Sequence, residues 1–175
     1  MSHLAVSAIG ADRPGIVAAV TKVLVDRGCN LEDASMSILR GHFAMMLVVA
    51  APDGTDPTTL ERDLGAATEA LGLVVVVRPI DEQSLERAEG DAWTVTLYGA
   101  DRPGIVHRVS AALADAHANI TDLTTRVIGD AARPVYAMFL DVTAPAGMAL
   151  DEALAVVAEE LGVSCTAHPA DADIL

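Results

Sequence analysis

The sequence predicts an α+β protein built from two copies of one βαββαβ unit. The string GADRPGIV occurs at residues 10–17 and again, unchanged, at residues 99–106. After both copies, apolar residues alternate where strands are expected and recur every third or fourth residue where helices are expected. The chain of 175 residues is 52% hydrophobic and 21% charged, which is enough apolar material for packed cores.

Each copy opens with a strand and continues into a helix. Apolar residues occupy every second position before the repeated string, the pattern of a strand with one buried face. Pro14 and Pro103 are expected at the first position of the helix, where no backbone donor is needed. Gly28 is expected to end the first helix, and His117, a weaker stop, takes its place in the second copy.

Two further strands are expected to form a hairpin in each copy. Asn30 and Asn119 open the first of these strands. Apolar residues then alternate over residues 43–49 and, correspondingly, over residues 136–142. The second copy carries extra residues in its hairpin, around Gly129 to Arg133, and a longer loop costs a sheet little.

A second helix and a fourth strand complete each copy. Leucine and other apolar residues recur at helical spacing over residues 60–71 and 150–161, and Leu-Gly ends both segments. Short apolar strands follow at residues 73–77 and 163–167. The resulting order is that of the ferredoxin-like sandwich, a four-stranded antiparallel sheet with both helices on one face.

The pattern also predicts where the units begin and end. We expect a first unit at residues 1–80 and a second at residues 92–170. Between them, residues 81–91 read DEQSLERAEGD, a charged acidic linker without periodic apolar residues. Residues 171–175 are expected to form a C-terminal tail.

Charge and hydropathy exclude several classes of partner. The formal net charge is −14, from 25 acidic and 11 basic side chains, and only 3% of the residues are aromatic. Direct binding to nucleic acid or to an anionic membrane surface is therefore not expected. The longest apolar run, residues 43–51, is about half of the roughly 20 residues that span a bilayer. With no signal peptide recognisable, the cytoplasm is the expected location.

Catalytic, cofactor and metal sites are not expected. The sequence contains no nucleophile with a base and an orienting group, no phosphate-binding G-x-x-x-x-G-K string and no dinucleotide-binding G-x-G-x-x-G string. The five histidines do not share repeat positions and lack metal-ligand spacing. Cys29 and Cys165 stand at unmatched positions and suggest small core residues.

The chemistry of the repeated loop suits a small zwitterion. The free N–H groups of a helix's first turn carry partial positive charge and can receive a carboxylate. Asp12 and Asp101 stand just outside the same helix ends and can accept hydrogen bonds from an α-ammonium group. Asn30 and Asn119 can add an amide contact. His107, which replaces Ala18, is expected to make the second site differ from the first.

A structural interpretation of the same residues stays open. Asp before Pro commonly starts a helix, Gly permits a tight turn, and Asn tolerates the left-handed conformation. A loop arginine either reaches a carboxylate or is simply solvated. The predicted ligand-binding residues are Gly10, Ala11, Asp12, Arg13, Pro14, Gly15, Ile16 and Asn30 in the first unit, and Gly99, Ala100, Asp101, Arg102, Pro103, Gly104, Ile105 and Asn119 in the second.

A duplicated βαββαβ unit with a D-R-P-G-I loop after its first strand and an Asn opening its second resembles the ACT domain over the whole chain. ACT domains are small-molecule regulatory modules attached to many enzymes of amino-acid metabolism. Within that family the chain is similar to the free-standing tandem proteins related to the glycine cleavage system transcriptional repressor. The resemblance implies that amino acids bind where the first loop of one unit meets the neighbouring unit. It does not identify the ligand, for which glycine and serine are the candidates.

The same resemblance implies a non-catalytic regulator, acting on a partner protein in the transcriptional regulation of amino-acid metabolism. A homodimer is expected, with edge strands at residues 31–39 and 120–128 paired within a chain or between chains, because a small sheet with an open edge needs cover. The alternatives are a structural adaptor without ligand and a regulatory subunit of an amino-acid-metabolising enzyme.

Overall fold

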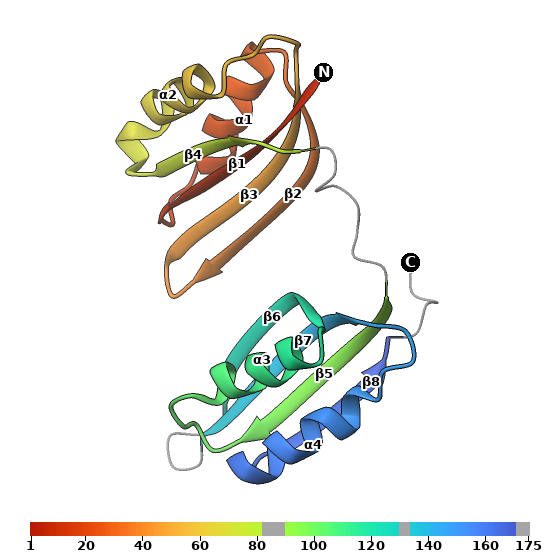
Figure 1. The fold of residues 1–175 in the computed structure, drawn as a ribbon. Coiled ribbons are helices and arrows are strands. Elements are labelled where there is room, and N and C mark those ends of the chain that lie inside the picture. Colours follow the sequence, from red (N-terminus) through yellow and green to blue (C-terminus); the bar gives the residue numbers. More distant parts are fainter. Residues whose placement is uncertain (82–89, 130–133, 171–175) are drawn as a thin grey trace. The chain divides into compact units, whose positions relative to one another are not determined.

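The computed structural model describes residues 1–81, 90–129 and 134–170 (Figure 1). The chain divides into two units, Met1–Glu86 and Arg87–Leu175. Most of the predicted linker, the extra hairpin residues 130–133 and the tail at 171–175 lie outside the described residues. The first unit contains β1 (Ser2–Ala11), α1 (Ile16–Asp26), β2 (Asn30–Leu39), β3 (His42–Ala51), α2 (Pro57–Thr68), the 3₁₀ turn η1 (Glu69–Leu71) and β4 (Val74–Pro79).

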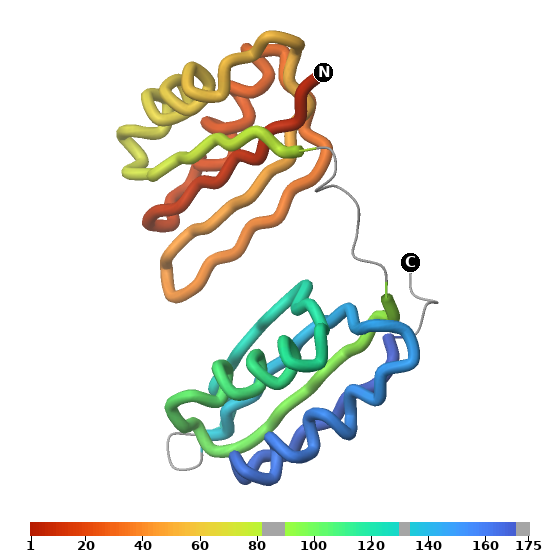
Figure 2. Tube along the Cα trace, viewed as in Figure 1, coloured from red at the N-terminus to blue at the C-terminus, as the bar shows by residue number. Residues whose placement is uncertain are grey.

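The second unit repeats this order without the 3₁₀ turn. It contains β5 (Asp91–Gly99), α3 (Ile105–Asp115), β6 (Asn119–Ile128), β7 (Val135–Ala144), α4 (Leu150–Leu161) and β8 (Ser164–Pro169). The two antiparallel sheets have strand orders β2-β3-β1-β4 and β6-β7-β5-β8. Both helices of each unit cover one face of its sheet, and the Cα trace shows the same path twice (Figure 2). The predicted pair of ferredoxin-like units is confirmed.

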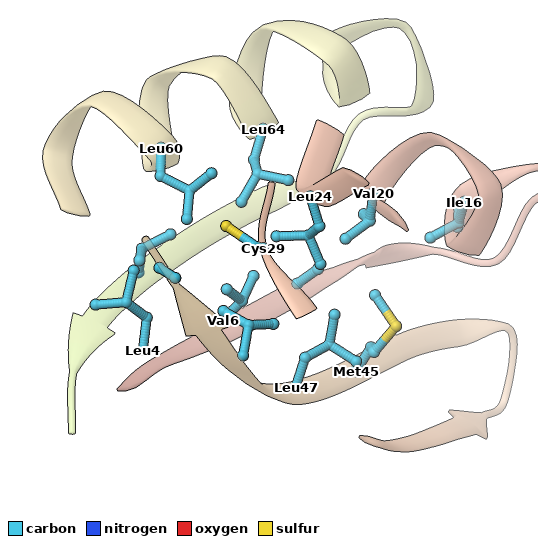
Figure 3. Close-up of a cluster of buried hydrophobic side chains, with 14 of the residues drawn as sticks. Leu4, Val6, Ile16, Val20, Leu24, Cys29, Met45, Leu47, Leu60 and Leu64 are labelled. Carbon is cyan, nitrogen blue, oxygen red and sulfur yellow. The ribbon is translucent and has the colours of Figure 1, made fainter. Parts of the chain in front are cut away.

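The core of each unit lies between its sheet and its helices. In the first unit, Leu4 and Val6 of β1 face Leu60 and Leu64 of α2, and all four side chains are buried (Figure 3). Every second residue of β1 and β3 points into this layer, as the alternation in the sequence predicts. The second core is built alike, with Val95, Leu97, Ile105, Val109, Leu113, Met138, Leu140, Leu150 and Leu154 buried.

The predicted helix starts at Pro14 and Pro103 are wrong by two residues. Helix α1 begins at Ile16, and its N-cap is Gly15 with φ 94° and ψ −5°; Gly104 has φ 93° and ψ −2° before α3. These angles are those of the third residue of a type II turn, where Gly is favoured and Pro is common just before it. Proline therefore forms a turn that precedes the helix.

The predicted helix ends are confirmed. Gly28 follows the C-cap of α1 with φ 68°, and its N–H donates to Val25 O while the next amide, of Cys29, donates to Leu24 O, both at 2.9 Å. This is the Schellman pattern. His117 makes the corresponding bonds after α3 and adopts φ 55°, a left-handed conformation that costs a residue with a Cβ more than it costs glycine.

Candidate functional site

The first glycine of the repeated string packs closely against another segment of its own unit. A Cβ atom on Gly10 would lie 2.7 Å from Leu73 Cδ2 and 2.9 Å from the carbonyl oxygen of Gly72. A Cβ atom on Gly99 would likewise overlap the side chain of Val163. Both glycines therefore let β1 or β5 approach the turn that follows the second helix, a packing role.

The second glycine of the string leaves the turn open. A Cβ atom on Gly15 or Gly104 would meet nothing within 4 Å. Their positive φ angles, and not a lack of space, are what favours glycine there. The backbone between Pro14 and Ile16, and its counterpart in the second unit, is consequently open to an approaching ligand.

The helices that follow the loops begin without a side-chain cap among the described residues. Their first backbone bonds run from Ala19 N to Gly15 O at 2.9 Å and from Arg108 N to Gly104 O at 3.0 Å. The amides of the preceding first turn have no acceptor within the helix. Helix α2 is different, because the Asp56 carboxylate accepts from Thr59 N at 3.0 Å, and its hydrogen bonds with Thr59 and Thr58 lower the pKa of Asp56. The repeated string therefore presents helix ends with room for an anion.

The aspartates of the loops stand beside these helix ends. The backbone N–H of Asp12 donates to the carbonyl oxygen of Gly41, 2.9 Å away in the turn between β2 and β3. This bond anchors the loop, whereas residue Asp12 itself is exposed, as is Asp101. A solvent-facing carboxylate next to an uncapped helix end can pair with a cation while the helix end receives an anion.

Arg102 contacts a helix end of its own unit. Its Nη1 atom donates to the carbonyl oxygen of Leu161, 3.4 Å away at the C-terminus of α4. A cation at that end of a helix is favourable because the helix dipole is negative there. This contact supports a structural role for Arg102. Arg13 and Arg102 are both exposed.

Asn30 and Asn119 do not lie near the loops of their own units. Asn30 pairs with Ala50, which pairs with His3 in β1, whereas Gly10 at the loop pairs with Phe43. His3 and Gly10 are seven residues apart in β1, which at the usual rise per residue is about 23 Å along the strand. In the second unit, Asn119 and Ala92 both pair with Thr143, and Ala92 is likewise seven residues from Gly99 along β5. The asparagines and the loops of one unit therefore stand at opposite ends of its sheet.

A depression of about 540 Å³ lies at the loop of the second unit. It is lined by Asp101, Arg102, Gly104, Ile105, Val106, His107 and Tyr136. His107 thus lies at the loop, as the sequence suggested. Within the described residues, no group of three or more His, Cys, Asp or Glu side chains is arranged to hold a metal ion, and no helix has the length and apolarity to cross a membrane.

Comparison with known proteins agrees with this architecture. Two family models, both described as ACT domain, match residues 2–78 and 93–151. The chain belongs to the ACT-domain family. Its two ACT units stand in tandem.

Two curated proteins and one solved structure are similar to most of this chain. The glycine cleavage system transcriptional repressor of Escherichia coli is 29% identical over 124 residues, which is 71% of this chain and 64% of that protein. Phosphoserine phosphatase SerB2 of Mycobacterium tuberculosis is 30% identical over 89% of this chain, but only 38% of the enzyme is covered. The crystal structure of an unknown protein from Galdieria sulphuraria has a TM-score of 0.81 and 29% identity, covering 97% of this chain and 98% of that one.

Tyr136 is the residue at the second loop that sequence reasoning missed. It begins the inward-facing alternation of β7 and pairs with Gly99, just as Phe43 of the first ACT unit pairs with Gly10. In the sequence, the difference between Phe43 and Tyr136 at matching positions of the two units was the feature that could have indicated this residue. Because aromatic residues at such a position usually belong to the core, only the depression distinguishes the phenol as a group at the site.

Proposed function

We propose that this protein is a non-catalytic sensor that binds a small amino acid at the D-R-P-G loop of each ACT unit. One observation carries the proposal: in both units an uncapped helix N-terminus lies beside an exposed aspartate, Asp12 or Asp101. The helix end matches a carboxylate and the aspartate matches an ammonium group. Glycine and L-serine are the candidate ligands, and the name of the Escherichia coli relative, a glycine cleavage system transcriptional repressor, supports glycine.

Ligand binding controls a partner protein in this proposal. The similar Escherichia coli protein is named a transcriptional repressor, which supports a role in the transcriptional regulation of amino-acid metabolism. With a net charge of −14, this chain acts through a protein partner and not by contacting DNA itself. The cytoplasm is its proposed location.

A second function is supported by the phosphatase match. In that relative the similar region makes up 38% of an enzyme. A regulatory subunit of an amino-acid-metabolising enzyme is therefore the alternative partner arrangement, with catalysis supplied by another chain. A structural adaptor without any ligand is the third possibility, and ligand binding separates it from the other two.

We also propose a homodimer. Strand β2 is an edge of the first sheet, and all ten of its residues, Asn30 to Leu39, are exposed. Met36 and Ile38 are 51% and 50% exposed. An uncovered edge strand with apolar side chains is a favourable surface for pairing with a second copy. The pairing of residues 31–39 with residues 120–128 stays a prediction.

Isothermal titration with a panel of amino acids tests the proposed function. Saturable binding of at least one small amino acid, lost when Asp12 and Asp101 are both replaced by Asn, is the expected result. Normal folding of the double variant, checked by circular dichroism, is required for this interpretation. If no amino acid binds at millimolar concentration, the adaptor alternative replaces the sensor.

A further inference from the structure

We infer that the loop of the second ACT unit selects an amino acid with a neutral hydroxyl-bearing side chain, and that Tyr136 and His107 make this selection. The inference rests on the proposed function and adds a ligand class to it. The first unit has Phe43 and Ala18 at the corresponding positions, and we expect it to accept small side chains without this preference.

Tyr136 lies next to the loop because of strand register. It pairs with Gly99 in β5 and with Val127 in β6, and it lines the depression at the loop. Its counterpart Phe43 pairs with Gly10 and is only 2% exposed, so it belongs to the core. Tyr136 is half-buried: it packs against the core of the second unit and also lines the depression. The second unit therefore places a phenol at the site where the first unit has a buried hydrocarbon ring.

His107 adds a second hydrogen-bonding group to the same depression. It is the third residue of α3 and is exposed, and the matching residue of α1 is Ala18. A neutral imidazole offers one donor and one acceptor, and a phenol hydroxyl both donates and accepts. Two groups that differ between the units thus converge on one depression beside a helix N-terminus.

The charges that line the depression favour a neutral ligand side chain. Asp101 and Arg102 contribute one charge of each sign; Asp101 is engaged by the ammonium group of the ligand in the proposed site and Arg102 by the carbonyl oxygen of Leu161, so neither is left to pair with a charged ligand side chain. A hydroxyl group can donate to one of the two polar groups and accept from the other. A methyl group in its place would leave both side chains without a ligand partner, which lowers affinity.

A site-resolved titration of the full chain tests the inference. The backbone amides of Gly15 and Gly104 report the first and second loops separately in ¹H–¹⁵N spectra. Glycine, L-alanine and L-serine are the probes, since alanine and serine differ by one hydroxyl group. At Gly104 we expect serine to bind about three- to tenfold more tightly than alanine. At Gly15 the ratio should be smaller than at Gly104, because Phe43 and Ala18 offer no hydrogen bond at the positions of Tyr136 and His107. The polar side chains near the first loop, Ser37 and His42, line a different depression together with Gly10.

Matched substitutions assign the preference to the two side chains. Replacing Tyr136→Phe or His107→Ala should lower the ratio of serine to alanine affinity at Gly104 toward one. The reciprocal pair, Phe43→Tyr with Ala18→His, should create a preference for serine at Gly15. Retained dispersion of the backbone amide signals in the substituted unit itself verifies that each variant is folded.

The outcomes separate this inference from the function on which it rests. Equal affinities for serine and alanine at Gly104, or a ratio unaffected by Tyr136→Phe and His107→Ala, would overturn the inference while amino-acid binding itself remained. If none of the three probes moves either glycine amide at millimolar concentration, both the inference and the proposed function are rejected.

Discussion

Glu61 of α2 accepts a hydrogen bond at Oε2 from the backbone amide of Val77 in β4, with 2.7 Å between the two atoms. β4 is an edge of the first sheet, and Val77 is only 2% exposed. The carboxylate thus accepts a hydrogen bond from an edge-strand amide that is shielded from water and has no neighbouring strand on that side. The same bond links helix α2 to strand β4.

Loss of this carboxylate should destabilise the first unit. Replacing Glu61→Ala leaves the amide of Val77 without its acceptor, and we expect the free energy of unfolding to fall by about 1–3 kcal/mol. Glu61→Gln keeps an acceptor and should cost less. Urea unfolding measures the loss, and hydrogen exchange at Val77 should quicken in the alanine variant. Equal stability of all three proteins would show that the bond contributes nothing.

The two glycines of the repeated string should respond differently to alanine. In Gly10→Ala the added methyl group meets Leu73 and the backbone of Gly72, and such overpacking typically costs about 1–3 kcal/mol. Gly15→Ala meets nothing, so the cost should be limited to the left-handed conformation, about 1 kcal/mol. Thermal unfolding of both variants measures this order, with Gly65→Ala in α2 as a control, because an added Cβ atom at Gly65 meets nothing within 4 Å. A larger loss for Gly15→Ala would contradict it.

His117 should be a site of stabilisation. Its φ of 55° is left-handed, and the corresponding residue Gly28 adopts φ 68° without a Cβ penalty. His117→Gly should therefore raise the free energy of unfolding by roughly 0.5–1 kcal/mol, after the extra backbone entropy of glycine is deducted. The reverse change, Gly28→His, should lower it. Chemical denaturation of both variants checks the two opposite signs.

Asp12 and Asp101 should matter to binding and little to folding. No cap bond from either side chain is present at the described helix ends, so Asp→Asn should change the stability without ligand by less than about 1 kcal/mol. Loss of a charge-assisted bond should weaken amino-acid binding by about ten- to a hundredfold. Calorimetry on Asp12→Asn and Asp101→Asn separately measures this, and the two losses should differ because only the second loop has His107 and Tyr136. Normal binding with lowered melting temperatures would assign the string to folding alone.

A small amino acid should bind weakly yet stabilise the fold measurably. Glycine has five heavy atoms, and a ceiling of about 1.5 kcal/mol per atom limits its affinity to low micromolar. At roughly 100 times the dissociation constant, ligand adds about 2.7 kcal/mol to stability. For a chain of this size that is a melting shift of about 5–10 °C. Scanning calorimetry with glycine and with betaine, whose ammonium is fully methylated, checks the shift, which betaine should not produce.

Much of the fold was predictable from local patterns. The alternation in strands, the helical spacing and the positions of Gly28 and His117 depend on residues that are neighbours in the chain, so the βαββαβ order follows from them. The helix starts at Pro14 and Pro103 were wrong because Pro-Gly fits a type II turn as well as a helix start. That choice depends on how the loop meets the sheet.

Composition, periodicity and the repeated string were sufficient to predict an acidic tandem of two ferredoxin-like units that carry the same loop. The contacts of the loop residues, in contrast, depend on how distant segments pack. Strand register moves Asn30 to the far end of the sheet from Gly10 and brings Tyr136 beside Gly99. Packing places Leu73 against Gly10 and the end of α4 against Arg102. These relationships join residues distant in the chain, and no local periodicity encodes which of them meet.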